Sequence, residues 1–381
     1  MTLAEGAAVS AAAEAGLIAS LDGAAEAGRR LPADVQQAVD AAIDGGRHGP
    51  RFHGAALRYA FATGQTPTFG QRLAKQWMLG LDALIEEGHL RDAARATRLL
   101  AQAFPQTPWV GTWELVFEKL PPADKRREPF RDDPGKAIQL SALPGAPTMV
   151  VAFCGVAHRL GPPLPVIHRW LGQLDASILY LRDFRNAGFA SGIESVAASA
   201  ADTAAHILAL SRGAGARRIA TFGNSLGGYA ALRYGPLLKA DRVLAFIPAT
   251  TGFEGVPEDR REEMVRAGWV DVVPLYARPD APRARVVFGA RNAADRAAAL
   301  RLAGLPKVAL EALPDWKTHD VFGALLRAGR LDAVFGWMTA PGHELDRGAM
   351  LAAELDMSDP SPPSLISRAF RRLRRLVAVR G

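Results

Sequence analysis

The sequence predicts an α/β domain, with a mostly parallel sheet covered by helices on both faces, after an N-terminal all-helical domain. From residue 148 onward, short apolar runs alternate with helical segments, a pattern typical of such a sheet. Residues 1–120 are rich in alanine at helical spacing and contain no convincing strand. A Gly-Asn-Ser-Leu-Gly stretch at 223–227 lies between an apolar run and a helix-compatible run, where a sharp turn is expected.

In the helical domain, 1–120, helices are expected over 32–44, 54–62, 71–87, 90–103 and 109–119. The two helices on either side of Gly88 form the clearest pattern, because Ala93 follows Gly88 by five residues and Pro105 follows it by seventeen. This segment is similar to a single tetratricopeptide repeat, in which small residues lie where two helices cross and a proline ends the repeat. The resemblance implies a surface for a protein partner, with the neighbouring helices as degenerate repeat partners.

A linker rich in proline and charge is expected over 121–135, before an α/β domain over 136–340. The strands of that domain are expected at its apolar runs: 148–153, 177–181, 219–222, 242–247, 284–288 and 307–312. Its helices are expected over 195–212, over 229–234 (closed by Gly235-Pro236), over 296–302 and over 321–337. Near-continuous apolar strands between helices indicate a sheet that is buried on both faces.

Ser225 is the candidate nucleophile because it lies at the predicted strand-to-helix turn. Such a turn forces the serine into a strained backbone conformation with its hydroxyl outward. Gly223 and Gly227 lack the Cβ atoms that would collide with neighbouring backbone, and Gly228 adds a small surface where the helix passes the strands. The alternative is a glycine-rich turn whose serine merely caps the helix.

A serine hydroxyl needs a neighbouring base, and that base needs an acid to hold its tautomer. Only His319 and His343 follow Ser225 in the chain. His319 lies between the last predicted strand and the final helix and is the better base, whereas His343 lies in a polar connector beyond that helix. Asp295 is the only carboxylate in the loop after Phe288 and is the candidate acid; its alternative role is an N-cap or surface carboxylate.

Residues from about 136 to 340 resemble an α/β-hydrolase fold domain. Three segments carry the resemblance: Gly-Asn-Ser-Leu-Gly-Gly at 223–228, Val-Val-Phe-Gly at 286–289, and Thr318-His319 before the last helix. Two features depart from the family pattern. The loop after Phe153 has no His-Gly-Gly-Gly, and asparagine stands at 292, where the family usually has aspartate.

The resemblance implies Ser225 as nucleophile, His319 as base and an acid near 292–295. It also implies an oxyanion hole made by the backbone N–H groups of Leu226 and Val156. Since residue 292 is asparagine, Asp295 must supply the negative charge from three residues later. Without that charge, histidine orientation weakens and activity falls.

The net charge of +7 is concentrated near the end of the chain. Six arginines follow residue 363, with no acidic residue among them: Arg368, Arg371, Arg372, Arg374, Arg375 and Arg380. The rest of the chain is therefore nearly neutral, and no nucleic-acid partner is indicated.

A linker over 341–363 precedes this basic tail, 364–381. If the tail is helical, its apolar residues lie on one stripe, away from the arginines: Ile366, Phe370, Leu373 and Val377. A basic amphipathic helix can lie on an anionic membrane surface. Docking on the helical domain and disorder are equally compatible with the sequence.

No apolar run approaches a membrane-spanning length, and the N-terminus lacks the basic segment of a secretory signal. The single cysteine, Cys154, excludes an internal disulfide and a cysteine metal cluster. We therefore expect a cytoplasmic protein, with peripheral membrane contact as an option, and no cofactor is implied.

The predicted function is a serine hydrolase acting on an ester or thioester through an acyl-enzyme. The alternatives are an acyltransferase to a sugar or lipid hydroxyl, and a non-catalytic scaffold with a vestigial hydrolase fold.

Overall fold

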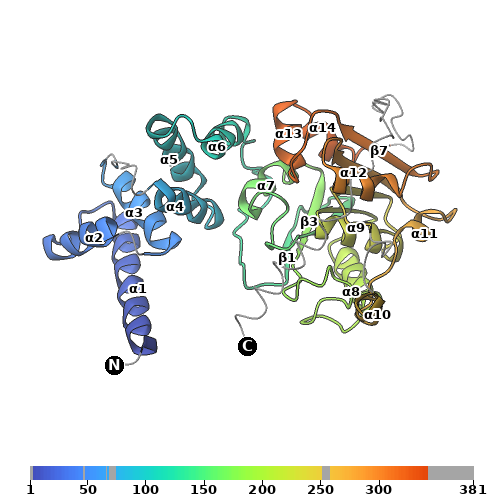
Figure 1. The fold of residues 1–381 in the computed structure, drawn as a ribbon, viewed down its shortest axis with the longest axis horizontal. Coiled ribbons are helices and arrows are strands. Elements are labelled where there is room, and N and C mark those ends of the chain that lie inside the picture. Colours follow the sequence, from blue (N-terminus) through green and yellow to red (C-terminus); the bar gives the residue numbers. More distant parts are fainter. Residues whose placement is uncertain (1–2, 46–47, 66, 68–73, 251–257, 342–381) are drawn as a thin grey trace. The chain divides into compact units, whose positions relative to one another are not determined.

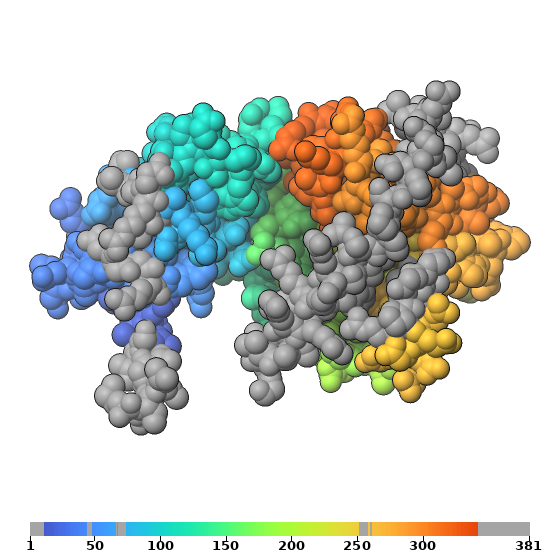
Figure 2. All heavy atoms as spheres, in the orientation of Figure 1, coloured from blue at the N-terminus to red at the C-terminus, as the bar shows by residue number. Residues whose placement is uncertain are grey.

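The computed structural model describes residues 3–45, 48–65, 67, 74–250 and 258–341. The residues outside these ranges are grey in Figure 1 and Figure 2. His343, nearly all of the predicted linker over 341–363 and the basic tail over 364–381 lie outside the described residues. Lipid contact by that tail and a protein partner of the helical domain stay predictions.

The chain divides into two compact units. A helical unit comprises Met1–Leu120 with Phe130–Asp132 and Pro163–His168, and an α/β unit comprises the remainder. The main helices of the helical unit are α1 (Leu3–Ala27), α2 (Ala33–Gly45), α3 (Pro50–Ala62), α4 (Ala74–Glu86), α5 (Leu90–Ala103) and α6 (Pro108–Lys119). Both α3 and α6 begin with proline, whose missing N–H costs nothing in the first turn of a helix.

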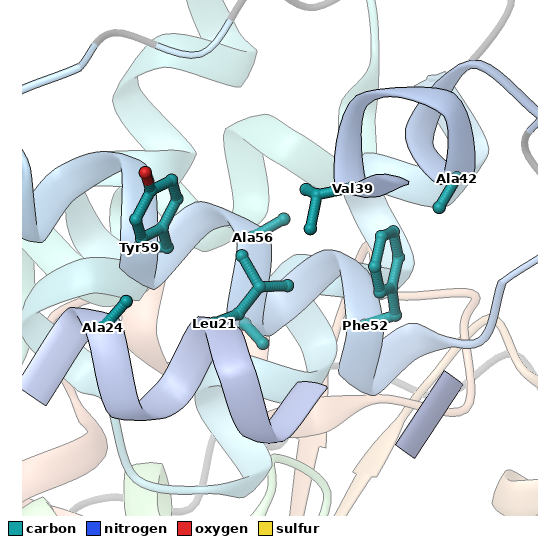
Figure 3. Packing of buried hydrophobic residues seen from close by; sticks show 8 residues of the cluster. Leu21, Ala24, Val39, Ala42, Phe52, Ala56 and Tyr59 are labelled. Carbon is teal, nitrogen blue, oxygen red and sulfur yellow. The ribbon is translucent and has the colours of Figure 1, made fainter. Parts of the chain in front are cut away.

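The first three helices share an apolar core, shown in Figure 3. Leu21 of α1 and Phe52 of α3 are fully buried there, and Val39 of α2 is 1% exposed. Tyr59 of α3 buries its ring and keeps its hydroxyl satisfied, donating to Gln36 Oε1 at 2.9 Å and accepting from the Leu31 N–H at 3.1 Å. This core is what holds α1 against α3.

Glycines allow α3 and α4 to cross in near contact. A Cβ on Gly80 would lie 2.8 Å from the His53 Cβ, and one on Gly54 would lie 3.2 Å from the Gly80 carbonyl oxygen. The turn from α4 to α5 passes through Gly88 at φ +80°, and Ala93 of α5 is fully buried. The helix pair predicted around Gly88 is thus present, while its likeness to a tetratricopeptide repeat stays a prediction.

The α/β unit is built on a seven-stranded sheet of order β1-β3-β2-β4-β5-β6-β7. Its strands are β1 (Ile138–Ser141), β2 (Thr148–Phe153), β3 (Ala176–Leu181), β4 (Arg218–Asn224), β5 (Arg242–Phe246), β6 (Arg283–Gly289) and β7 (Val308–Leu313). Only β1 runs antiparallel to its neighbour. Every residue of β2, β3 and β5 is buried, so both faces of the sheet are covered. The predicted fold class is confirmed.

The remaining helices are α7 (Leu164–Leu171), α8 (Ala200–Gly213), α9 (Leu226–Leu237), α10 (Glu258–Arg266), α11 (Val273–Tyr276), α12 (Ala293–Leu300), α13 (Val321–Arg327) and α14 (Leu331–Gly336). None of the described helices is both long and apolar enough to span a bilayer.

Some predicted elements differ from the observed ones, as four examples show. The helix expected from 195 begins at Ala200, because the Ser199 hydroxyl accepts the Asp202 N–H at 3.1 Å and caps it there. The helix expected over 321–337 is two helices, broken at Gly329 with φ +64°. Pro236 lies inside α9 and does not end it. The four-residue edge strand β1 was not predicted at all.

The segment expected as a linker, 121–135, packs mainly on the α/β unit. Arg127 is 7% exposed and donates to the carbonyl oxygens of Leu174 and Ala176, both at 3.1 Å. Arg182, at the end of β3, donates to the Asp133 carbonyl at 3.2 Å. Buried guanidinium groups thus tie this segment to the edge of the sheet.

Candidate active site

Ser225 lies on the turn between β4 and α9 with φ 57° and ψ −116°. A non-glycine residue in this region stores roughly 1–3 kcal/mol of strain, which persists only where the surroundings demand it. Although Ser225 occupies the N-cap position of α9, its side chain makes no capping hydrogen bond. The alternative of a purely capping serine was therefore wrong.

The glycines around Ser225 are required by close backbone contacts. A Cβ on Gly223 would lie 2.0 Å from the Gly227 carbonyl oxygen, and one on Gly227 would lie 1.9 Å from the Phe153 carbonyl oxygen. A Cβ on Gly228 would approach the Phe246 carbonyl oxygen to 2.9 Å. The turn can thus sit directly on the ends of β2 and β5 only because these side chains are absent.

Three predicted residues meet at this edge of the sheet. His319, in the loop between β7 and α13, places Nε2 2.8 Å from the Ser225 hydroxyl oxygen. Its Nδ1 lies 2.8 Å from Oδ1 of Asp295. With the proton on Nδ1, the imidazole donates to the carboxylate and its Nε2 is free to accept from the serine. The histidine side chain is 51% exposed and the Asp295 side chain 7%.

Backbone contacts hold the loop after β6 and the loop after β7 together. The Ala290 N–H donates to the Leu313 carbonyl at 3.0 Å, and the Arg291 N–H donates to the Trp316 carbonyl at 3.1 Å. Gly289 permits this approach, because a Cβ there would lie 2.5 Å from the Trp316 carbonyl oxygen. The separation between Asp295 and His319 is therefore set by main chain.

Asp295 contacts the imidazole and Asn292 does not take that place. Asn292 is the N-cap of α12, and its side-chain oxygen accepts the Asp295 N–H at 3.2 Å. The helix predicted from Arg296 consequently begins at Ala293, and Asp295 falls in its first turn. The alternative of Asp295 as an N-cap was wrong, because Asn292 fills that position.

The two predicted oxyanion donors lie on the adjacent turns. Leu226 is the first residue of α9, so its N–H has no acceptor within the helix. Val156 lies in a tight turn after β2, closed by a 2.8 Å bond from the Gly155 N–H to the Arg159 carbonyl. Within the described ranges, no backbone carbonyl accepts the Val156 N–H. A Cβ on Gly155 would lie 3.0 Å from the Asn224 carbonyl oxygen, which places this turn against the serine turn.

Two residues that shape the site were not predicted. The Asp183 carboxylate accepts the N–H groups of Arg185 at 3.1 Å, Ala187 at 2.8 Å and Phe189 at 2.9 Å, and so orders the loop after β3. An aspartate opening an Asn-Ala-Gly turn was the available signal.

Trp269 is the second such residue. Its ring stacks on Tyr229 with centroids 4.5 Å apart, and a Cβ on Gly188 would lie 2.8 Å from it and 3.0 Å from the Leu226 side chain. The tryptophan is distant in sequence from these neighbours, so only tertiary structure reveals its place beside the serine turn.

Among the described residues, no group of three or more histidine, cysteine, aspartate or glutamate side chains could hold a metal ion.

No family model and no curated protein matches the sequence. Solved structures similar to the chain include a brefeldin A esterase described as a bacterial homologue of human hormone-sensitive lipase, at 19% identity over 56% of this chain and 75% of that one, with a TM-score of 0.38. TT1662 from Thermus thermophilus matches at 16% identity over 57% of this chain and 99% of that one, with a TM-score of 0.38. A putative esterase from Staphylococcus aureus matches at 10% identity over 62% and 95%, with a TM-score of 0.41.

The α/β unit itself has the α/β-hydrolase fold. Its features are the mostly parallel sheet, the strained strand-to-helix turn at Ser225, and the chain order of the three contacting residues Ser225, Asp295 and His319. The fold resemblance predicted from the sequence is confirmed.

Proposed function

We propose that the chain is a serine hydrolase that cleaves an ester or thioester through an acyl-enzyme intermediate. One observation carries the proposal: an unbroken hydrogen-bonded chain runs from Asp295 through His319 to Ser225, with both contacts at 2.8 Å. A serine hydroxyl becomes nucleophilic when a base of this kind takes its proton.

In the first half of the reaction, the Ser225 oxygen attacks the substrate carbonyl carbon while His319 Nε2 accepts the hydroxyl proton. The carbonyl oxygen becomes an oxyanion, which the N–H groups of Leu226 and Val156 would stabilise. One such donor contributes on the order of 3–4 kcal/mol to the transition state. The imidazolium, stabilised by the Asp295 carboxylate, then gives its proton to the departing alcohol or thiol.

In the second half, His319 takes a proton from water, and the resulting hydroxide attacks the acyl carbon. The carboxylic acid leaves as Ser225 regains its proton. The 51% exposure of the histidine side chain supports water as the acceptor, because a site built to pass the acyl group to another hydroxyl must exclude water. Asp295 at the imidazole also weighs against a vestigial site.

A fluorophosphonate probe tests the proposal directly. The full chain should form one covalent adduct, located by peptide mapping at Ser225, because such probes need an activated serine. Ser225→Ala should abolish the adduct with unchanged circular dichroism. Ser191→Ala, in a loop of the same unit, should label like the parent chain. A folded protein that gains no adduct, or gains it at another serine, contradicts the proposed function.

A further inference from the structure

Two exposed apolar side chains lie at the same edge of the sheet as the serine. Among the described residues, five large apolar side chains are exposed: Leu140, Val156, Phe184, Leu237 and Val265. Val156 follows β2 and Phe184 follows β3, each three residues beyond the strand end. The ends of β2, β3 and β4 are level with one another, because Phe153 pairs with both Leu181 and Gly223. Val156 and Phe184 therefore follow strand ends at the level of the serine turn.

Phe184 is held in its exposed position by its neighbours. It is 47% exposed, although the preceding residue, Asp183, is 5% exposed and binds three backbone N–H groups of the loop. The His158 ring lies edge-on to the phenylalanine ring, with centroids 5.1 Å apart. The next residue, Arg185, turns its guanidinium to the Gly192 carbonyl at 3.3 Å. An ordered loop thus presents an aromatic ring to solvent beside the site.

The order of the strands decides which part of a substrate faces this surface. Asp295 and His319 follow β6 and β7, on one side of β4, whereas β2 and β3 lie on the other side. The leaving oxygen or sulfur must lie near His319 Nε2 to receive its proton. The remaining substituent on the carbonyl carbon, the acyl chain, then points away from the histidine.

We infer that Val156 and Phe184 form the contact surface for an apolar acyl chain of the substrate. The inference rests on the proposed function and adds a substrate class to it: esters of medium-length aliphatic acids. Two strand spacings, about 10 Å, separate β3 from β4. An acetyl group does not reach across that distance to Phe184, whereas an extended octanoyl chain does.

The His158 ring that contacts Phe184 is compatible with an apolar ligand. Burial lowers the pKa of the His158 imidazole, and the positive charge of Arg182 lowers it further, against the opposing effect of Asp183. The ring therefore favours its uncharged form more than a solvent-exposed histidine does. The Val156 side chain is 37% exposed and consists only of aliphatic carbon. The side chains of Val156 and Phe184 offer no hydrogen bond or opposite charge to an acyl chain that carries a carboxylate.

Chain-length dependence on the full-length protein tests the inference. We compare kcat/KM for p-nitrophenyl octanoate and p-nitrophenyl acetate in the parent chain, in Phe184→Ala and in the control Leu237→Ala. Leu237 is 40% exposed at the end of α9, away from the serine turn. The ratio of octanoate to acetate should fall roughly 5- to 20-fold in Phe184→Ala, mainly through KM, because part of the chain loses apolar contact. It should stay unchanged in Leu237→Ala.

A second pair of substrates separates the acyl side from the alcohol side. Octyl acetate and ethyl acetate place the long chain on the leaving group, so their ratio should be the same in the parent and in Phe184→Ala. The inference is overturned if the parent shows no preference for octanoate, if Phe184→Ala keeps that preference, or if the octyl acetate ratio falls instead. Failure to label Ser225 in the parent contradicts the proposed function, and labelling without chain-length preference contradicts only this inference.

Discussion

At the scale of single residues, one helical turn separates two side chains with different tasks. Asn292 caps α12 by accepting the Asp295 N–H, and Asp295 presents its carboxylate to His319. An asparagine at the imidazole could accept the ring N–H but could not stabilise an imidazolium by charge. If an asparagine contacted the imidazole and an aspartate capped the helix, the hydrogen-bond pattern would be similar. The imidazolium would then be much less stabilised, and hydrolysis would be slower.

Asp295→Asn should keep the fold and lower turnover by up to roughly 10⁴-fold, the scale seen when a triad aspartate loses its charge. Asn292→Ala is the matched comparison: it should cost about 1 kcal/mol of stability through loss of the cap, with a far smaller effect on turnover. Steady-state ester hydrolysis and thermal melting measure both. Equal turnover losses in the two variants would show that Asp295 does not act as the acid.

At the scale of elements, the turn from β4 to α9 leaves no room for a Cβ atom at its glycines, Gly223, Gly227 and Gly228. A Cβ on Gly227 would lie 1.9 Å from the Phe153 carbonyl oxygen at the end of β2, and one on Gly228 would lie 2.9 Å from the Phe246 carbonyl oxygen at the end of β5. Local sequence therefore imposes the strain at Ser225, and the neighbouring strands maintain it. A methyl group at one of these glycines should displace the backbone of the whole turn.

Gly223→Ala should destabilise the protein by about 3 kcal/mol or more and abolish probe labelling, because its Cβ would lie 2.0 Å from the Gly227 carbonyl oxygen. Gly213→Ala is the control, since nothing lies within 4 Å of a Cβ at that helical position. It should be neutral or stabilising by up to about 1 kcal/mol. Thermal melting and labelling decide, and a Gly223→Ala protein that melts and labels like the parent would refute the steric account.

At the scale of the whole molecule, a buried histidine makes the stability of the helical unit depend on pH. His53 of the helical unit is fully buried between the rings of Phe52 and Trp77, with centroid distances of 5.4 and 5.5 Å. Burial, reinforced by the nearby His48, lowers the pKa of His53 to about 4. The folded helical unit thus keeps this histidine neutral.

Since an unfolded histidine titrates near pH 6.5, the unfolded chain binds the proton more readily than the folded one. Stability should be full above pH 6.5 and should fall as the pH drops from 6.5 toward 4. We expect the free energy of unfolding of the helical unit to fall by about 2 kcal/mol between pH 7.5 and pH 5.

Urea unfolding of the full chain at the two pH values, followed by hydrogen exchange, measures this loss in each unit. His53→Leu should remove most of the acid sensitivity of the helical unit. The exposed His206 lies on α8 of the other unit, and His206→Leu should leave that sensitivity in place. An unchanged pH dependence in His53→Leu would show that His53 is not its source.

Features that depend on residues close together in the chain could be predicted from the sequence. Apolar runs indicated β2 to β7, because strands covered on both faces are mostly apolar. The glycines around Ser225 marked the turn, because few other residues permit its backbone contacts. Ser225 and His319 could be chosen because each lies at a strand-to-helix connection at one end of the sheet.

Tertiary structure alone decided what depends on contacts between distant segments. The choice of Asp295 over Asn292 follows from the approach of the loop after β6 to the loop after β7, through main-chain bonds that no local pattern records. The edge strand β1 exists because it pairs with β3. Phe184 and Trp269 reach the site only through the register of strands and the packing of loops. Short-range sterics and hydrophobic periodicity depend on residues that are close in sequence, so a sequence pattern can reveal them. The contacts that complete a site form between distant segments that folding brings together.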